Sequence, residues 1–191
     1  MPFEAALLRM RELHQAVRNG ADGRVLLCEH DPVFTAGRAT PSEELPPSVV
    51  PIERGGKVTY HGPGQLVVYP IVPLPRRDVR DWLRRLERFG VDVAAAFALV
   101  GEPSLDGTGV FVAGRKVASI GIAVKHWINL HGIAINVQVA NEAWAPIRPC
   151  GRSPTSMSDL STCAGRVVTM AEARTAAAAA VSRLLHPADP V

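Results

Sequence analysis

Residues 109–137, GVFVAGRKVASIGIAVKHWINLHGIAINV, carry the strongest indication of a β-sheet in this sequence. Two strand-like runs, 109–113 and 116–125, are separated at Gly114-Arg115, so we predict a β-hairpin that turns there. A third strand-like run, 129–137, follows closely behind the second. Short connections between successive strands are typical of an antiparallel sheet.

Three helices are predicted outside this stretch. The first, at 3–19, repeats apolar residues every three or four positions. The second, at 78–100, is the longest and carries one apolar face. The last is rich in alanine and is capped by Thr169 and Glu172, which have the spacing of a capping box.

Two further strands are predicted at 25–29 and 65–72, and the four prolines of 40–51 indicate a surface loop. Pro70 lacks a backbone N–H, which implies an edge strand or a bulge in the second of these strands. Helices at both ends and in the middle, with hairpins between them, predict an α+β fold with a mixed, mostly antiparallel sheet.

Length and composition exclude several classes of protein. The 191 residues, 47% hydrophobic and 20% charged, suit one well-packed domain over 1–191 rather than a disordered or coiled-coil chain. No apolar run reaches the ~18 residues of a membrane-spanning helix. The first residues mix acids and arginines, unlike a secretory signal. We therefore expect no membrane association.

The cysteines and the net charge narrow the class further. An odd number of cysteines, at positions 28, 150 and 163, argues against a disulfide framework and favours a reducing compartment, so we expect a cytoplasmic protein. A net charge of +3 permits an acidic partner. The sequence has neither zinc-type Cys/His spacing nor an RNA-binding aromatic cluster, so we expect neither a metal nor a nucleic-acid partner.

The densest unusual segment is RGGKVTYHGPGQ, residues 54–65. Its four glycines let a backbone approach a ligand closely, and its Arg, Tyr, His and Gln side chains offer hydrogen-bond donors. It is not a phosphate-binding Walker loop, because Val58 follows Lys57 where Ser or Thr should hold Mg²⁺. The alternative is a glycine-rich turn between two strands.

Cys150 and Lys116 are the candidate reactive residues. Cys150 lies between Pro149 and Gly151, where backbone N–H groups could form an oxyanion site, although a cysteine is more often a core residue. A free thiol has a pKa of ~8.5 and needs a nearby cation or base to become a nucleophile at neutral pH. Alternation along 116–122 predicts that Lys116 lies on the same apolar face of the strand as Ala118. Its side chain would then either extend past the end of the strand to solvent or hold a desolvated amine.

Two histidines and an arginine stripe are further candidates. His131 shares a face with Ile133 and Ile135 by alternation, which predicts a hydrogen-bonded core imidazole. A Cys–His catalytic pair would need His61 or His131 near the reactive cysteine. The arginines opposite the apolar face of the long helix are predicted to form a solvated face or a docking surface for an acidic protein; they are Arg77, Arg80, Arg84 and Arg88.

Taken together, these segments resemble the lipoyl(octanoyl) transferase family. The resemblance is carried by these segments: EHDPVFTAGR (29–38), RGGKVTYHGPGQLVVY (54–69), GVF (109–111), KVASIG (116–121), LHGIAIN (130–136), and PCG (149–151) followed by Thr155-Ser156. The RGG…YHGPGQ segment and the 34-residue interval from Lys116 to Cys150 are its most specific features.

The resemblance implies a single catalytic domain similar to the catalytic module of biotin and lipoate protein ligases. Such an enzyme moves an octanoyl or lipoyl group from acyl carrier protein to a lysine of a lipoyl domain, in 2-oxoacid dehydrogenases or the glycine-cleavage H protein. It uses no cofactor, and its reaction is the first step of endogenous protein lipoylation.

The resemblance also assigns roles to residues. Cys150 is the acyl-thioester nucleophile and Lys116 the residue that activates it, as an ion-pair partner or as a base. The residues implied to line the acyl and thioester site are Arg54, Gly55, Gly56, Lys57, Val58, Thr59, Tyr60, His61, Ser119, Ile120, Gly121, Gly132, Ile133 and Ala134.

Two alternatives remain at this level. An ATP-dependent lipoate- or biotin-type ligase on the same fold would need no cysteine, and a non-catalytic module would bind acyl carrier protein without turnover. The chain also departs from the family pattern, because family members usually begin with a strand before the first helix. We therefore expect either that the sheet lacks one edge strand or that the given start of the chain is late.

Overall fold

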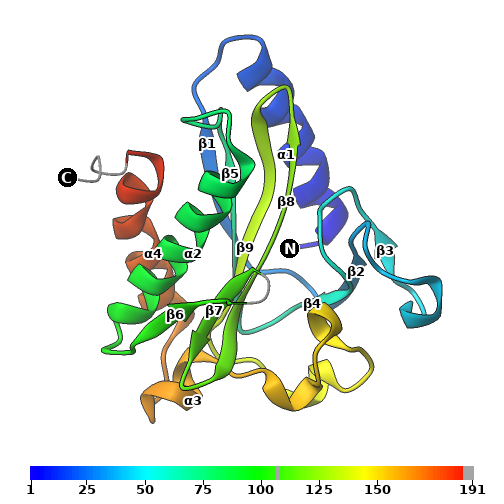
Figure 1. Ribbon diagram of the computed structural model, residues 1–191, viewed down its shortest axis with the longest axis vertical. Coiled ribbons are helices and arrows are strands. Elements are labelled where there is room, and N and C mark those ends of the chain that lie inside the picture. Colours follow the sequence, from blue (N-terminus) through cyan, green and yellow to red (C-terminus); the bar gives the residue numbers. More distant parts are fainter. Residues whose placement is uncertain (106–107, 187–191) are drawn as a thin grey trace.

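The computed structural model describes residues 1–105 and 108–186, with the backbone but not the side chain of Cys150. Its main sheet has six strands in the order β1-β5-β9-β8-β7-β6, and every neighbouring pair is antiparallel. A small sheet, β3-β2-β4, has one parallel and one antiparallel pair. The predicted α+β fold with a mixed, mostly antiparallel sheet is confirmed (Figure 1).

The bounds of the elements are as follows. The helices are α1 (Phe3–Arg18), α2 (Val79–Ala95), α3 (Leu160–Ala164) and α4 (Met170–Leu185), with short 3₁₀ turns η1 (Ser42–Glu44), η2 (Asn141–Trp144), η3 (Pro149–Gly151) and η4 (Pro154–Ser156). The strands are β1 (Arg24–Cys28), β2 (Val33–Ala36), β3 (Val50–Pro51), β4 (Thr59–His61), β5 (Gln65–Ile71), β6 (Gly101–Pro103), β7 (Gly109–Val112), β8 (Arg115–Lys125) and β9 (Ile128–Asn136).

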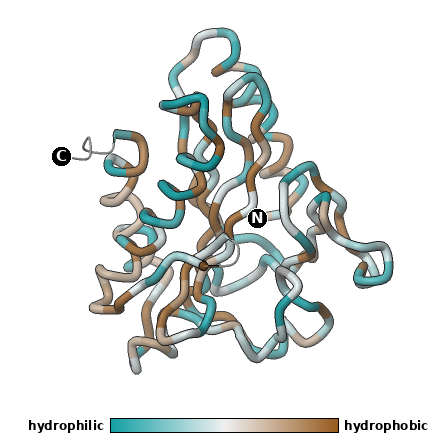
Figure 2. Tube along the Cα trace, viewed as in Figure 1, coloured by the Kyte–Doolittle hydropathy of each residue, from teal (hydrophilic) through white to brown (hydrophobic). Residues whose placement is uncertain are grey.

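Helices cover both faces of the main sheet. α1 packs on one face, and α2 and α4 pack together on the other (Figure 1). Alternation along β5 supplies both cores, since Leu66 and Val68 face α2 and α4 whereas Val67 and Tyr69 face α1. Hydrophobic residues accordingly gather on the central strands (Figure 2).

The predicted helices are present, with adjusted ends. The helix predicted at 78–100 ends at Ala95, and Asp78 is its N-cap, accepting hydrogen bonds from the N–H groups of Arg80 and Asp81. The capping box of Thr169 and Glu172 at the start of α4 is confirmed.

The β7–β8 hairpin is confirmed, but its turn lies one residue earlier than predicted. The turn residues are Ala113 (φ 47°) and Gly114 (φ 74°). A two-residue hairpin loop of this kind needs positive φ at both positions, so that its twist matches that of the strands.

The predicted alternation along β8 is wrong at its first residues. Val110 pairs with Ala118 and Phe111 with Lys116, so β8 carries one extra residue, Val117, in a β-bulge. Val117 and Ala118 consequently both pack in the core against α2 and α4. Lys116 therefore faces the opposite side of the sheet, together with Ser119.

The edge-strand prediction from Pro70 is also wrong, because β5 lies between β1 and β9. The pairing of β5 with β9 stops at Val68, which is opposite Ile133. Pro70 pairs only with Val25 of β1. An internal strand tolerates this proline because the neighbouring strand has already diverged where its N–H would be required.

Candidate active site

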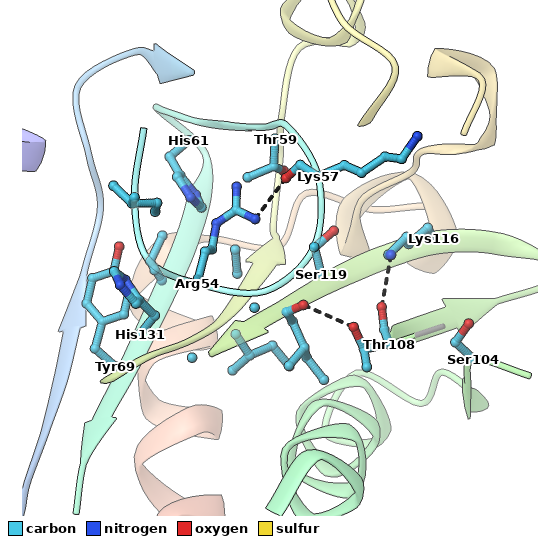
Figure 3. Close-up of a pocket in the computed structure, with 18 of the residues that line it drawn as sticks. Arg54, Lys57, Thr59, His61, Tyr69, Ser104, Thr108, Lys116, Ser119 and His131 are labelled. Carbon is cyan, nitrogen blue, oxygen red and sulfur yellow. Dashed lines mark hydrogen bonds between the residues drawn. The ribbon is translucent and has the colours of Figure 1, made fainter. Parts of the chain in front are cut away.

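A cavity of about 230 Å³ lies on the α1 face of the main sheet. Its floor consists of β8, β9 and β5, and its roof is the segment from Ile52 to His61, which runs from the end of β3 through β4 of the small sheet. One end of the cavity lies at Lys116 and Thr108, and the other lies at His131 and Tyr69 (Figure 3). Between these two ends lie Arg54, Thr59 and Ser119.

The floor is made from small residues in cross-strand rows. Ser119 is paired with Ala134, which in turn is paired with Val67 of β5. In the next row Gly121 is paired with Gly132. A Cβ atom at Gly132 would lie 2.1 Å from the Val68 carbonyl oxygen, so only glycine permits this approach of β9 to β5. Small side chains leave the space above the sheet open.

Arg54 holds the roof in place. Its Nη1 donates to the carbonyl oxygens of Gly55 (3.0 Å) and Lys57 (2.8 Å), and its Nη2 donates to the carbonyl (2.8 Å) and hydroxyl (2.9 Å) oxygens of Thr35. The N–H of Gly55 in turn donates to the carbonyl oxygen of Ile122 in β8. The buried guanidinium thus joins the loop to β2, and the backbone of Gly55 joins the loop to β8 of the main sheet.

Only part of the predicted glycine-rich segment lines the cavity. Arg54, Gly56, Lys57, Thr59 and His61 do so, whereas three residues predicted to line the site do not: Gly55, Val58 and Tyr60. The reason is alternation along β4, which turns Val58 and Tyr60 into a separate hydrophobic cluster with Trp144 and Met157. The remaining predicted lining residues all contact the cavity: Ser119, Ile120, Gly121, Gly132, Ile133 and Ala134.

At one end of the cavity, the lysine end, Lys116 is 97% buried, since only 3% of its surface is exposed. Its Nζ donates to the Thr108 carbonyl oxygen at 3.0 Å and lies 5.8 Å from the centre of the Phe111 ring. The guanidinium of Arg152 lies 5.0 Å from the same ring. The β8 bulge therefore delivers a buried amine to the cavity.

Arg152 immediately follows η3, the turn that contains Cys150. Arg152 lines the same cavity as Lys116, and a Cβ on Gly151 would contact the Lys57 side chain. The N–H of Ser158 donates to the carbonyl oxygen of Lys116, which ties the chain after η3 to β8. The backbone around Cys150 thus lies at the lysine end, whereas the predicted contact of its thiol falls outside the described residues.

The opposite end, the ring end, is formed by Phe3, His61, Tyr69 and His131. Phe3 stacks on His61 with ring centres 6.2 Å apart, and Tyr69 meets His131 edge-on at 6.3 Å. Nδ1 of His61 donates to Oε1 of Gln65 at 2.7 Å. Burial lowers the pKa of His61 to about 3 and also lowers that of His131, so both rings are neutral at pH 7.

The predicted placement of His131 is wrong. His131 has a left-handed backbone (φ 63°) and lines the cavity, whereas Ile133 and Ile135 pack in the core against α2 and α4. The predicted hydrogen-bonded imidazole is also wrong, because Nε2 of His131 has no hydrogen-bond partner and lies 3.8 Å from Glu53. Tertiary contacts rather than alternation place this ring.

Sequence reasoning missed several cavity residues. Val67 and Tyr69 follow from alternation along β5 once its cavity-facing side is known. Phe3, Ser104, Thr108 and Arg152 carry no local signal, since each lies at the end of an element or in a loop.

The described residues include no cluster of His, Cys, Asp or Glu that could hold a metal ion. Across the same part of the chain, no helix is long and apolar enough to cross a membrane. The four arginines predicted to form a solvated face are exposed; Arg80, Arg84 and Arg88 lie on α2, and Arg77 precedes its N-cap.

Comparison with known proteins gives consistent matches. Residues 2–182 match the family described as lipoyl protein ligase A/B catalytic domain. Two relatives named octanoyltransferase are each 42% identical. The one from Geobacter sulfurreducens aligns over 97% of this chain and 80% of its own, and the one from Mycobacterium tuberculosis over 99% and 85%.

Solved structures share the fold at lower identity. A crystal structure of lipoate-protein ligase A bound with ATP has a TM-score of 0.77 and 17% identity, over 94% of this chain and 81% of that chain. A bi-partite lipoate protein ligase from Thermoplasma acidophilum has a TM-score of 0.74 and 17% identity, over 94% and 79%. The predicted likeness to the lipoate ligase fold is therefore confirmed.

Proposed function

The chain belongs to the family of lipoyl protein ligase A/B catalytic domains, and from this premise we propose that it is an octanoyltransferase of protein lipoylation. In this proposal residues 1–191 form one catalytic domain, with acyl carrier protein as donor and a lipoyl-domain lysine as acceptor. The observation that carries the proposal is the buried amine of Lys116, at the end of a cavity where the backbone around Cys150 also lies.

Lys116 and Cys150 have complementary roles in this proposal. A positively charged amine beside a thiol favours the thiolate, and each unit by which it lowers the thiol pKa corresponds to about 1.4 kcal/mol. The hydrogen bond to Thr108 fixes the position of the Lys116 amine at the cavity. The other two cysteines lie elsewhere: burial raises the pKa of Cys28 to about 11, and Cys163 packs beside the core of the opposite face.

The first step is thioester exchange. The Cys150 thiolate attacks the carbonyl carbon of the octanoyl thioester, a new C–S bond forms, and the bond to the carrier thiol breaks. The departing thiolate takes up a proton, for which the Lys116 ammonium is the donor. One thioester replaces another, so the acyl group keeps its transfer potential.

The second step is amide formation. The neutral amine of the acceptor lysine attacks the Cys150 thioester, the C–N bond forms, and the cysteine leaves as a thiolate. The proton lost from the acceptor amine returns to Lys116, which restores the starting state. An amide is more stable than a thioester, so this step drives the transfer forward.

The cavity suits a saturated acyl chain. Its floor presents Gly121, Gly132 and Ala134, and its far end presents rings that are neutral at pH 7. Apolar walls with few hydrogen-bonding groups are what a hydrocarbon ligand requires. The unpaired thiols of Cys28 and Cys163 support a reducing compartment, the cytoplasm, as the place of action.

The test is intact mass spectrometry after incubation with octanoyl-acyl carrier protein. We expect the wild-type protein to gain one octanoyl group and to lose it when an acceptor lipoyl domain is added. Cys150→Ser should gain no stable adduct, and Lys116→Met should acylate at least about 100-fold more slowly. Cys163→Ser is the matched control and should behave as wild type.

The same experiment separates the alternatives. Transfer that requires ATP and survives Cys150→Ser would show a ligase of the adenylate-forming type. Tight binding of the carrier without any transfer would show a non-catalytic binding module. Either outcome would overturn the proposed mechanism.

A further inference from the structure

The ring end of the cavity has a feature that the transfer chemistry does not use. Phe3, the first residue of α1, is 98% buried, with 2% of its surface exposed, and it lines the end of the cavity that lies opposite Lys116. Its ring meets His30 edge-on at 5.3 Å and stacks on His61. A large aromatic side chain from another element thus closes the end opposite Lys116.

The cavity runs across the strands rather than along them. Its lining passes from Thr108, beside β7, over β8 and β9 to Tyr69 on β5. Neighbouring strands lie about 4.8 Å apart, so the path from β7 to β5 spans about 14 Å. An eight-carbon saturated chain, with C–C bonds of about 1.5 Å, extends about 9 Å. The remainder accommodates the thioester at the lysine end and the radius of the terminal methyl.

A second packed layer prevents the cavity from continuing past its rings. His30 is 1% exposed, and its Nε2 lies 2.9 Å from the Tyr69 hydroxyl and 3.6 Å from Sγ of Cys28. Burial lowers the pKa of His30, so this layer is also neutral at pH 7. A longer chain could therefore extend only into the space that the Phe3 ring fills.

Resting on the proposed function, we propose that Phe3 is the residue that sets the length of the acyl chain. Its ring stops the terminal methyl of an octanoyl group, and its stacking on His61 and edge-on contact with His30 hold the ring in place. Because Phe3 touches the end of the substrate and not its carbonyl, it determines specificity without taking part in bond making.

The test is the chain-length profile of three variants. In Phe3→Ala the vacated space should admit longer chains, so the ratio of kcat/KM for decanoyl donor to that for octanoyl donor should rise at least about tenfold. Phe3→Trp should shift the profile the other way, towards hexanoyl. Met10→Ala is the matched control, since Met10 is fully buried on the same helix but does not line the cavity. Its ratio should equal that of the wild type.

Binding of free fatty acids supplies a second readout that needs no transfer. Calorimetry should show that Phe3→Ala gains at least about tenfold in affinity for decanoate relative to octanoate, and that Met10→Ala does not. If the wild type transfers octanoyl groups but Phe3→Ala keeps the wild-type ratio, the assignment of Phe3 is wrong and the proposed function stands. If no variant transfers, the proposed function fails and the fatty-acid ratios alone decide the role of Phe3.

Discussion

Replacing Arg54 with methionine should destabilise the protein by removing the guanidinium that links the cavity roof to β2. Methionine has a similar reach but donates no hydrogen bond. Hydrogen bonds to a charged group contribute about 1.5–3 kcal/mol each. Counting one on the loop side, to Lys57, and one on the β2 side, to Thr35, gives about 3–6 kcal/mol. Burying the guanidinium itself costs free energy, so we expect the lower half of this range, about 3–4 kcal/mol.

The assay is urea unfolding followed by tryptophan fluorescence, with the free energy of unfolding taken from the midpoint and slope. Arg54→Lys should lie between wild type and Arg54→Met, because one ammonium cannot span both sides of the site. Arg24→Met is the control: Arg24 is exposed and donates only to nearby carbonyls, so its change should stay within about 0.5 kcal/mol.

If Arg54→Met unfolds within about 1 kcal/mol of wild type, the roof does not depend on the guanidinium. A stable Arg54→Met protein that binds octanoate at least tenfold more weakly would instead make Arg54 a ligand-contacting residue.

Three further predictions concern the stability of the protein. Burial lowers the folded-state pKa of His61 to about 3, against about 6.5 when unfolded, so the unfolded chain alone takes up a proton below pH 6.5. The contribution of His61 to the free energy of unfolding should therefore be constant above pH 6.5 and should fall by about 3 kcal/mol by pH 4.5. His131 should lower the stability in the same direction. Calorimetric melting between pH 8 and 4.5 measures this change, and a melting temperature that stays constant over this range would contradict it. Gly132→Ala should yield little soluble protein, because its methyl would collide with the Val68 carbonyl oxygen; a soluble variant with the wild-type melting temperature would show that β9 can shift. Asp159→Ala should cost about 2 kcal/mol in urea unfolding, because its carboxylate caps α3 and accepts from the N–H of Val139, whereas a change below about 0.5 kcal/mol would mean that water replaces both bonds.

Several features of the protein follow from local sequence. Apolar spacing predicts α1 and α2, the capping box predicts the start of α4, and two strand-like runs with a short turn predict the β7–β8 hairpin. These signals are local, because a helix or a hairpin depends on residues a few positions apart. The glycine-rich composition of residues 54–65 likewise identifies, from the sequence, a segment that forms part of the cavity roof.

Local sequence patterns thus predict the elements, the fold class and the segments that hold the candidate residues. The direction in which those residues face depends on tertiary packing. The bulge at Val117 turns Lys116 into the cavity, and the left-handed backbone of His131 moves its ring out of the core. In β8 the bulge shifts the register against β7, and a shift of one residue reverses every side chain. At His131 the register with β8 is unbroken, and the positive φ of this one residue redirects the ring. Neither change alters the local sequence pattern.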